Sequence, residues 1–167
     1  SVAVERGLQP LADIIFAQEQ KECDINALAA AYVDPEKGVN TPEDAILGAK
    51  DIIAELISDD AETRKALREF LFNEGLIVSV FSDKQEDKEC LKVSISASAE
   101  RAVEIIKTKF LKDSAFNSIM TEAIEDSYAR LIFPSIEREV RNELTDKANE
   151  QAIKMFEVNL KPLLMQP

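Results

Sequence analysis

The stretch RLIFPSIEREVRNEL, residues 130–144, decides the fold because two helical patterns meet in it. Pro134 disfavours helix at the residue before it, yet it suits the first turn of the next helix. After Pro134, apolar residues recur every three or four positions: Ile136, Val140, Leu144, Ala148, Ala152 and Met155. The pattern predicts an unbroken helix over residues 134–161, closed by Pro162, in which Val140 and Leu144 are buried against earlier helices. Such a helix is roughly 40 Å long, so shorter segments should pack along it.

Shorter helical patterns precede the long one, at residues 7–17, 24–32, 42–56, from a cap at Ser96 or Ser98 to 110, and at 114–132. Thr41 is a good N-cap for the helix at 42–56, because Pro42 follows it at the first helical position. Ser58 or Asp59 is expected to cap a further helix, and Gly75 suits the left-handed position that ends it. With only 4 glycines and 6 prolines, the chain favours long helices over many short strands.

Two short runs in the middle of the chain have a different composition. LIVSVF at 76–81 and LKVSIS at 91–96 are rich in β-branched residues, which is typical of strands. We therefore predict a mainly α fold, a multi-helix domain organised around a long C-terminal helix, with a small β element near the middle. A chain of 167 residues is long enough to bury a core, so residues 1–167 should form a single helical domain.

The composition restricts the partners and the compartment. The net charge is −12, which repels phosphate backbones and anionic membranes unless the basic residues cluster. No stretch is apolar enough over sufficient length to cross a bilayer. Cys23 and Cys90 lie far apart and form no CxxC motif, so we expect reduced thiols and a cytoplasmic protein.

Residues that carry chemistry are almost absent. The chain has no histidine, which removes Ser-His and Cys-His activation and the commonest transition-metal ligand. It contains no phosphate-binding glycine loop of the GxGxxG or GxxxxGK[ST] type. The acidic cluster DPEKG at 34–38 lacks the ligand spacing of a calcium loop, so we interpret it as a solvated turn. We therefore expect no catalytic residue, no cofactor, no metal, no small-molecule substrate and no enzyme activity.

One charged helix face offers candidate partner-binding residues. Arg138 and Arg141 lie on adjacent turns and could together bind a phosphate or a partner's carboxylate. Glu137 and Arg141 are also i,i+4 partners in the favourable order, which gives a structural alternative. The acids around these arginines favour an intraprotein salt bridge over phosphate binding.

Three runs carry a resemblance to a known family. They are ERGLQPLADII at 5–15, the longer run at 37–70 that begins KGVNTPEDAILGAK, and PSIEREVRNELTDKANEQAIKMFEVNLKPLL at 134–164. In this order they resemble an internal portion of Tex-type transcription accessory proteins, so the chain is expected to be a fragment of a larger protein. The resemblance implies a bacterial cytoplasmic protein that binds RNA or DNA through other domains, among them an S1-type RNA-binding domain outside this chain.

The family usually has several tens of residues between the two predicted strands, where this chain has only a short polar segment. We therefore predict that Asp83 and Lys84 flank residues missing from the sequence. Three function classes remain: a scaffold for nucleic-acid-binding domains, a docking module for RNA polymerase or another transcription partner, and, least favoured, an enzyme.

Overall fold

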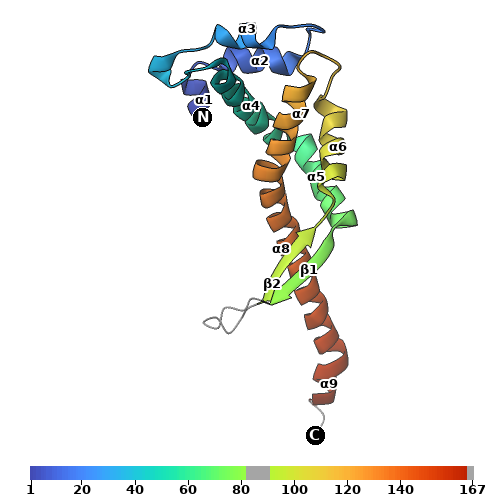
Figure 1. Ribbon diagram of the computed structural model, residues 1–167. Helices are drawn as coiled ribbons and strands as arrows, with labels where there is room; N and C mark the ends of the chain where they lie inside the picture. The colour runs from blue at the N-terminus through green and yellow to red at the C-terminus, as the bar shows by residue number, and fades with distance from the viewer. Residues whose placement is uncertain (82–90, 165–167) are drawn as a thin grey trace.

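The computed structural model describes residues 1–81 and 91–164 (Figure 1). Its helices are α1 (Val2–Glu5), α2 (Gln9–Ala17), α3 (Ile25–Ala30), η1 (Pro35–Lys37), α4 (Pro42–Ser58), α5 (Ala61–Glu74), α6 (Ala99–Phe110), α7 (Asn117–Asp126), η2 (Ser127–Ile132), α8 (Phe133–Met155), η3 (Phe156–Leu160) and α9 (Lys161–Leu164). Its strands are β1 (Leu76–Phe81) and β2 (Leu91–Ser96). The predicted fold class is confirmed: helices dominate, the C-terminal helix is long, and a small β element lies near the middle.

The C-terminal rod is longer than the sequence predicts. Helical structure runs without interruption from α7 through η2, α8 and η3 to α9, over residues 117–164. At about 1.5 Å per residue this rod is roughly 70 Å long, and its lower end projects away from the other helices (Figure 1). The predicted break at Pro134 and the predicted end at Pro162 are both wrong.

A π-helical turn before each proline explains why the rod continues. In an α-helix, proline removes one hydrogen bond, and its ring collides with the carbonyl four residues earlier. In η2 the turn is wider, and the Phe133 N–H bonds to the Tyr128 carbonyl five residues back. Pro134 then enters at the start of α8, and Pro162 follows η3 in the same way. The sequence shows the prolines but not the widened turns that accommodate them.

The core lies in the upper part of the molecule, around α4. This helix packs against α2, α3, α7 and η2. Its buried residues are Ala45, Ala49, Ile52, Ile53, Ala54, Ile57 and Ser58. Gly48 allows a close approach, because a Cβ at this position would collide with the Leu8 side chain. Thr41 caps α4 as predicted, with its hydroxyl oxygen accepting the Asp44 N–H at 3.1 Å.

Both boundaries of α5 differ from the prediction. Asp60, rather than Ser58 or Asp59, caps α5, because α4 extends through Ser58. Gly75 is extended, with φ −71° and ψ 144°, because strand β1 begins at the next residue. Glycine is still required there, since a Cβ would lie 2.6 Å from the Ile95 side chain and would collide with the Leu71 carbonyl.

The apolar stripe of α8 is buried only in its first half. Ile136 and Val140 are fully buried, and Leu144 is half-buried against the core. Ala148 and Ala152 are exposed, and Met155 is 64% exposed. The predicted burial of Val140 is confirmed and Leu144 is only partly buried, whereas the stripe beyond Leu144 extends past the other elements into solvent.

The two predicted strands form an antiparallel hairpin that lies beside α8. Ile77 pairs with Ile95 and Ser79 with Val93. Since side chains alternate along a strand, these four residues share one face of the sheet. Ile95 is buried on this face, whereas Ile77 is 61% exposed. The predicted gap between Asp83 and Lys84 lies outside the described residues.

The buried half of the rod should dominate its contribution to stability. Ile136→Ala should lower the free energy of unfolding by about 2–5 kcal/mol, because it leaves a cavity in the core. Met155→Ala removes a side chain of similar size from an exposed position and should cost less than about 0.5 kcal/mol. Urea denaturation followed by circular dichroism measures both. Equal costs would contradict the assigned burial.

The cap of α5 should make stability depend on pH. The pKa of Asp60 lies below its ordinary value, chiefly because Lys109 donates a hydrogen bond to the carboxylate, with a further contribution from Thr63. Because the pKa is lower in the folded state, the ionised Asp60 stabilises the fold at pH values above its unfolded-state pKa, which is near 4. This stabilisation is lost as the pH falls through the folded-state pKa.

Asp60→Asn keeps a capping side chain but removes the charge. It should therefore be less stable than wild type at pH 7, and the difference should shrink below about pH 4. Asp59→Asn, at an adjacent exposed carboxylate, should stay within about 0.5 kcal/mol of wild type. Urea midpoints measured from pH 7 to pH 3 test this. A difference for Asp60→Asn that did not change with pH would contradict it.

Candidate functional site

The candidate residue Arg141 contacts the outer edge of the hairpin. Its guanidinium donates a hydrogen bond to the Val93 carbonyl at 3.0 Å and lies 3.7 Å from the Glu137 carboxylate. Glu137 in turn accepts the Ile95 N–H at 3.0 Å. Two side chains of α8 therefore bond the backbone of β2 where a third strand would otherwise pair. We call Glu137 and Arg141 the edge clamp.

The two candidate arginines have different surroundings. Arg138 is exposed, and no ion pair or side-chain hydrogen bond is recorded for it among the described residues. Arg141 is 34% exposed at its side chain and is held by the edge clamp. The Glu137–Arg141 pair that the sequence spacing suggests is therefore present. Partner binding through Arg138 and Arg141 stays a prediction.

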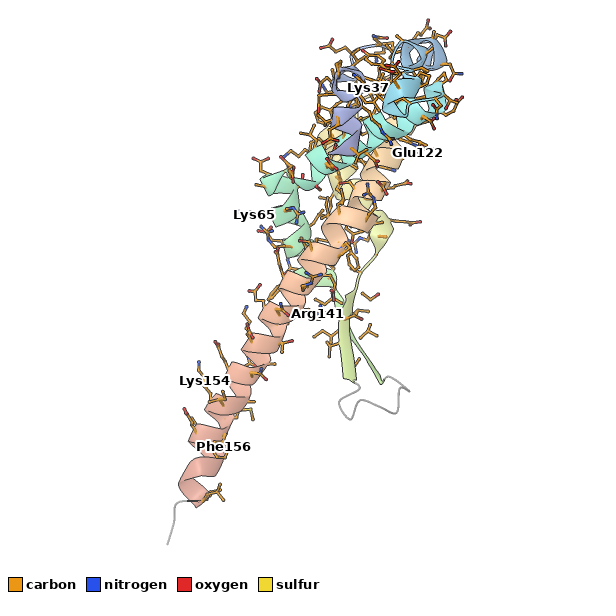
Figure 2. All side chains as sticks on the ribbon, turned by 90° about the vertical axis from the view of Figure 1, so that its left-hand side faces the viewer. Lys37, Lys65, Glu122, Arg141, Lys154 and Phe156 are labelled. Atoms are coloured by element: carbon orange, nitrogen blue, oxygen red, sulfur yellow. The ribbon has the colours of Figure 1, made fainter. Side chains whose placement is uncertain are left out.

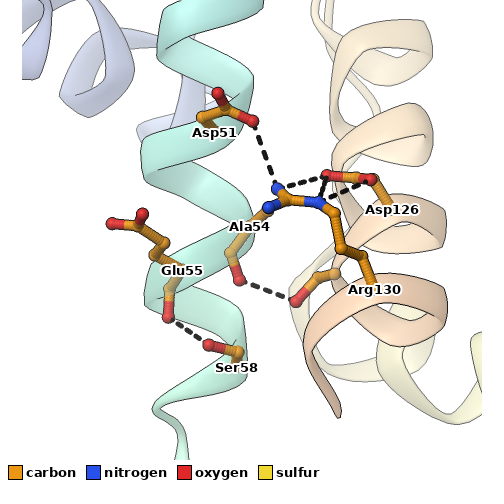
Figure 3. Close-up of polar contacts among 7 residues, drawn as sticks. Asp51, Ala54, Glu55, Ser58, Asp126 and Arg130 are labelled. Carbon is orange, nitrogen blue, oxygen red and sulfur yellow. Dashed lines mark hydrogen bonds and ion pairs between the residues drawn. The ribbon is translucent and has the colours of Figure 1, made fainter. Parts of the chain in front are cut away.

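A polar network on the other side of the rod joins η2 to α4 (Figure 3). Arg130 donates to Asp126 at 2.8 Å and to Asp51 of α4 at 3.2 Å. The pKa of Arg130 is raised above its ordinary value, chiefly by the hydrogen bond to Asp126. The buried Ser127 hydroxyl donates to the Ala54 carbonyl at 2.6 Å. This network fixes the π-helical turn on the core, and sequence reasoning missed it because its members lie far apart in the chain.

A surface cavity of about 600 Å³ lies between α6 and the start of the rod. Val103, Tyr128 and Ala129 line it, with Lys107 and Glu125 among its charged residues. The Tyr128 hydroxyl is buried without a hydrogen-bond partner in the described structure, and burial raises its pKa. The buried Tyr128 hydroxyl offers no accessible polar group to this cavity, so the polar groups that line it belong to its charged residues, among them Lys107 and Glu125.

Nine basic side chains of the described residues form ion pairs with acids. Lys50 pairs with Glu122 at 2.7 Å and Arg101 pairs with Glu74 at 2.8 Å. Further pairs are Lys21–Asp113, Arg68–Glu139, Lys107–Glu104, Lys109 with Asp60 and Glu62, and Lys147–Glu143. This local pairing matches the interleaving of opposite charges in the sequence, and it gives phosphate groups little uncompensated positive charge.

The projecting end of the rod carries apolar side chains in solvent. Figure 2 shows Lys154 and Phe156 on this part of the helix. The exposed large apolar residues of the projecting end are Ile153, Met155, Phe156, Val158, Leu163 and Leu164. They occupy more than one side of the helix, among charged residues such as Lys154 and Glu157, and exposed apolar residues that gather mark protein interaction sites. The projecting end is therefore a candidate docking surface.

Groups that would support catalysis or metal binding do not gather in the described structure. The chain has no histidine. Across residues 1–81 and 91–164 there is no group of three cysteine, aspartate or glutamate side chains placed to hold a metal. Within the same residues, no helix combines the length and apolarity needed to span a membrane.

The edge clamp gives a testable difference between the two arginines. Arg141→Ala should lower the opening free energy of the hairpin by about 1–2 kcal/mol, because the Val93 carbonyl loses a charged donor and Glu137 loses its partner. Arg138→Ala is the matched control and should change it by less than about 0.5 kcal/mol. Amide hydrogen exchange of Val78, Ser94 and Ser96, whose N–H groups lie within the ladder, measures the opening. Equal acceleration in both variants would show that the clamp does not hold the sheet.

Comparison with known proteins identifies the family. Residues 20–94 match the family model described as Tex central region-like. The uncharacterised protein YdcI of Bacillus subtilis is 37% identical across the whole chain, which spans 28% of YdcI. The alignment has 201 positions against 167 residues, so YdcI contains residues that this chain lacks.

Two further relatives carry informative names. The transcriptional accessory protein Tex of Neisseria gonorrhoeae is 26% identical over 98% of the chain and 26% of its own length. The S1 RNA-binding domain-containing protein 1 of Pongo abelii is 24% identical over 81% of the chain and 18% of its own length. Together with the central-region match, these similarities show that the chain belongs to the Tex-type transcription accessory proteins, as a helical portion of that family.

Proposed function

We propose that the chain is a non-catalytic helical scaffold within a Tex-type transcription accessory protein. In this role the rod sets the distance and orientation between the helical body and other parts of the protein, and those other parts bind RNA or DNA. The names of the relatives place the family in transcription and include an S1 RNA-binding protein. The chain spans only about a quarter of the relatives matched along most of its length, so the remaining parts have ample room for such domains.

The observation that carries the proposal is the continuous rod. Its first half is fixed to the body by the buried Ile136 and Val140 and by the network of Ser127 and Arg130. Its second half projects with apolar side chains exposed. A long helix that is anchored at one end and carries exposed apolar side chains at the other is suited to linking two bodies. The absence of histidine from the chain favours the non-catalytic role.

The second candidate function is docking of RNA polymerase or another transcription partner. The exposed apolar residues of the projecting end favour it, because such surfaces mark protein interaction sites when they gather. Binding of purified RNA polymerase to the isolated chain separates this role from a scaffold role. In either role we expect a cytoplasmic protein that needs no cofactor.

The scaffold proposal predicts weak binding of nucleic acid. Nine basic side chains of the described residues form ion pairs with acids, and the net charge of the chain is −12. The 167-residue chain should therefore bind labelled RNA or duplex DNA no tighter than about 10⁻⁴ M at physiological salt, the weak edge of ordinary non-specific binding. Fluorescence anisotropy across a salt series measures the affinity.

A charge-neutralising variant provides the matched control for this titration. Glu122→Gln and Glu74→Gln together free Lys50 and Arg101 from their partners and should strengthen binding at low salt. Micromolar binding by the wild-type chain, with a steep loss as salt rises, would overturn the scaffold proposal. It would place a nucleic-acid-binding face on this chain.

A further inference from the structure

The cavity between α6 and the start of the rod has walls from two helical elements that pack against each other (Figure 1). Val103 of α6 and Tyr128 of η2 line it and are themselves buried, so they supply apolar surface from both walls. Ala99 and Ala129 also line it and are exposed. Small side chains on both walls let a further helix approach closely, because the distance between packed helices depends on the side chains at the contact. We call this cavity the α6–η2 groove.

The size and the walls of the α6–η2 groove suit a helical ligand. Its volume of about 600 Å³ lies within the range of about 300–1,000 Å³ that is typical of binding pockets. An amphipathic helix binds such a surface by placing its apolar face in the groove between helices. One wall is the π-helical turn η2, and π-helical turns occur frequently at functional sites.

The charges that line the groove are not balanced. Lys107 and Arg101 are each paired with a glutamate, at 3.5 Å and 2.8 Å. Glu100 of α6 and Glu125 of α7 line the groove from its two sides and are exposed, and no ion pair is recorded for either among the described residues. Two unpaired carboxylates beside an apolar surface complement a ligand whose apolar face is flanked by positive side chains.

We propose that the α6–η2 groove binds a basic amphipathic helix of a protein partner. Apolar side chains of that helix contact Val103 and Tyr128, and its flanking lysines or arginines pair with Glu100 and Glu125. The net charge of −12 attracts such a ligand, whereas it repels nucleic acid, an anionic membrane and a second copy of this chain. The proposal does not depend on the scaffold role of the rod, because no residue of the projecting end lines the groove.

The probe is a fluorescein-labelled peptide of about 16 residues, with leucines spaced three and four apart and lysines on both flanks of that face. A glutamine peptide replaces every leucine with glutamine and keeps the charge. A glutamate peptide replaces every lysine with glutamate and keeps the apolar face. Fluorescence anisotropy with the 167-residue chain at about 0.15 M salt measures binding. The leucine–lysine peptide should bind with a dissociation constant below about 100 µM, and both other peptides should bind at least about tenfold more weakly.

Variants of the chain test whether the peptide occupies the groove. Ala129→Arg places a long cationic side chain in the groove from an exposed position and should weaken binding at least about tenfold. Ala129→Ser keeps the side chain small and should bind like wild type. Circular dichroism verifies that every variant is folded.

A second pair of variants separates the groove from the general charge of the surface. Glu100→Gln with Glu125→Gln should weaken binding about fivefold, because two exposed ion pairs are lost. Glu36→Gln with Glu43→Gln is the matched control, since it removes the same charge from exposed residues outside the groove. This control should change the affinity less than about twofold.

Three results would overturn the proposal. The first is a leucine–lysine peptide that does not bind at concentrations up to about 200 µM. The second is equal affinity for the glutamine peptide, which would show only a general attraction of cations to an acidic surface. The third is binding that neither Ala129→Arg nor the Glu100 and Glu125 variant weakens more than the control does, which would place the peptide elsewhere, for example on the projecting end of the rod.

Discussion

The π-helical turn at η2 is the feature on which the rest of the structure depends. It lets the helix pass Pro134 without a break, because the widened turn moves the preceding carbonyls away from the proline ring. Ser127 and Arg130 of the same turn bond α4, so the widened turn is also the point where the rod is fixed to the core. Without this turn, α7 and α8 would be two helices with a variable angle between them.

The edge clamp holds the hairpin in a fixed position beside the rod. Glu137 and Arg141 lie within two turns of Pro134, and they bond β2 through its backbone rather than through its side chains. The hairpin is therefore positioned by α8, even though α5 and α6 connect it to the chain. One edge of the small sheet is thereby bonded inside the chain.

The sequence predicts the individual helices and strands well, but it does not predict that the C-terminal helices join into one continuous rod. The apolar period, the Thr41 cap and the β-branched runs are local signals, and the structure confirms the helices and strands that they indicate. Pro134 was misinterpreted because a π-helical turn has no sequence signature comparable to proline's. The stripe beyond Leu144 has the period of a core helix, but burial depends on which elements lie opposite. The edge clamp joins α8 to residues of β2 that lie more than forty positions away in the chain. Sequence spacing therefore predicts only the i,i+4 pair of Glu137 and Arg141.

The continuity of the rod past Pro134 is the central claim, and a distance measured across the proline tests it most directly. Spin labels at positions 122 and 154, on exposed residues of the two halves, should lie about 48 Å apart if the helix is unbroken. Pulsed electron paramagnetic resonance should then give one narrow distance distribution near that value, with Cys23 and Cys90 replaced by serine. A broad distribution, or a clearly shorter distance, would show a bend at Pro134 and contradict the account.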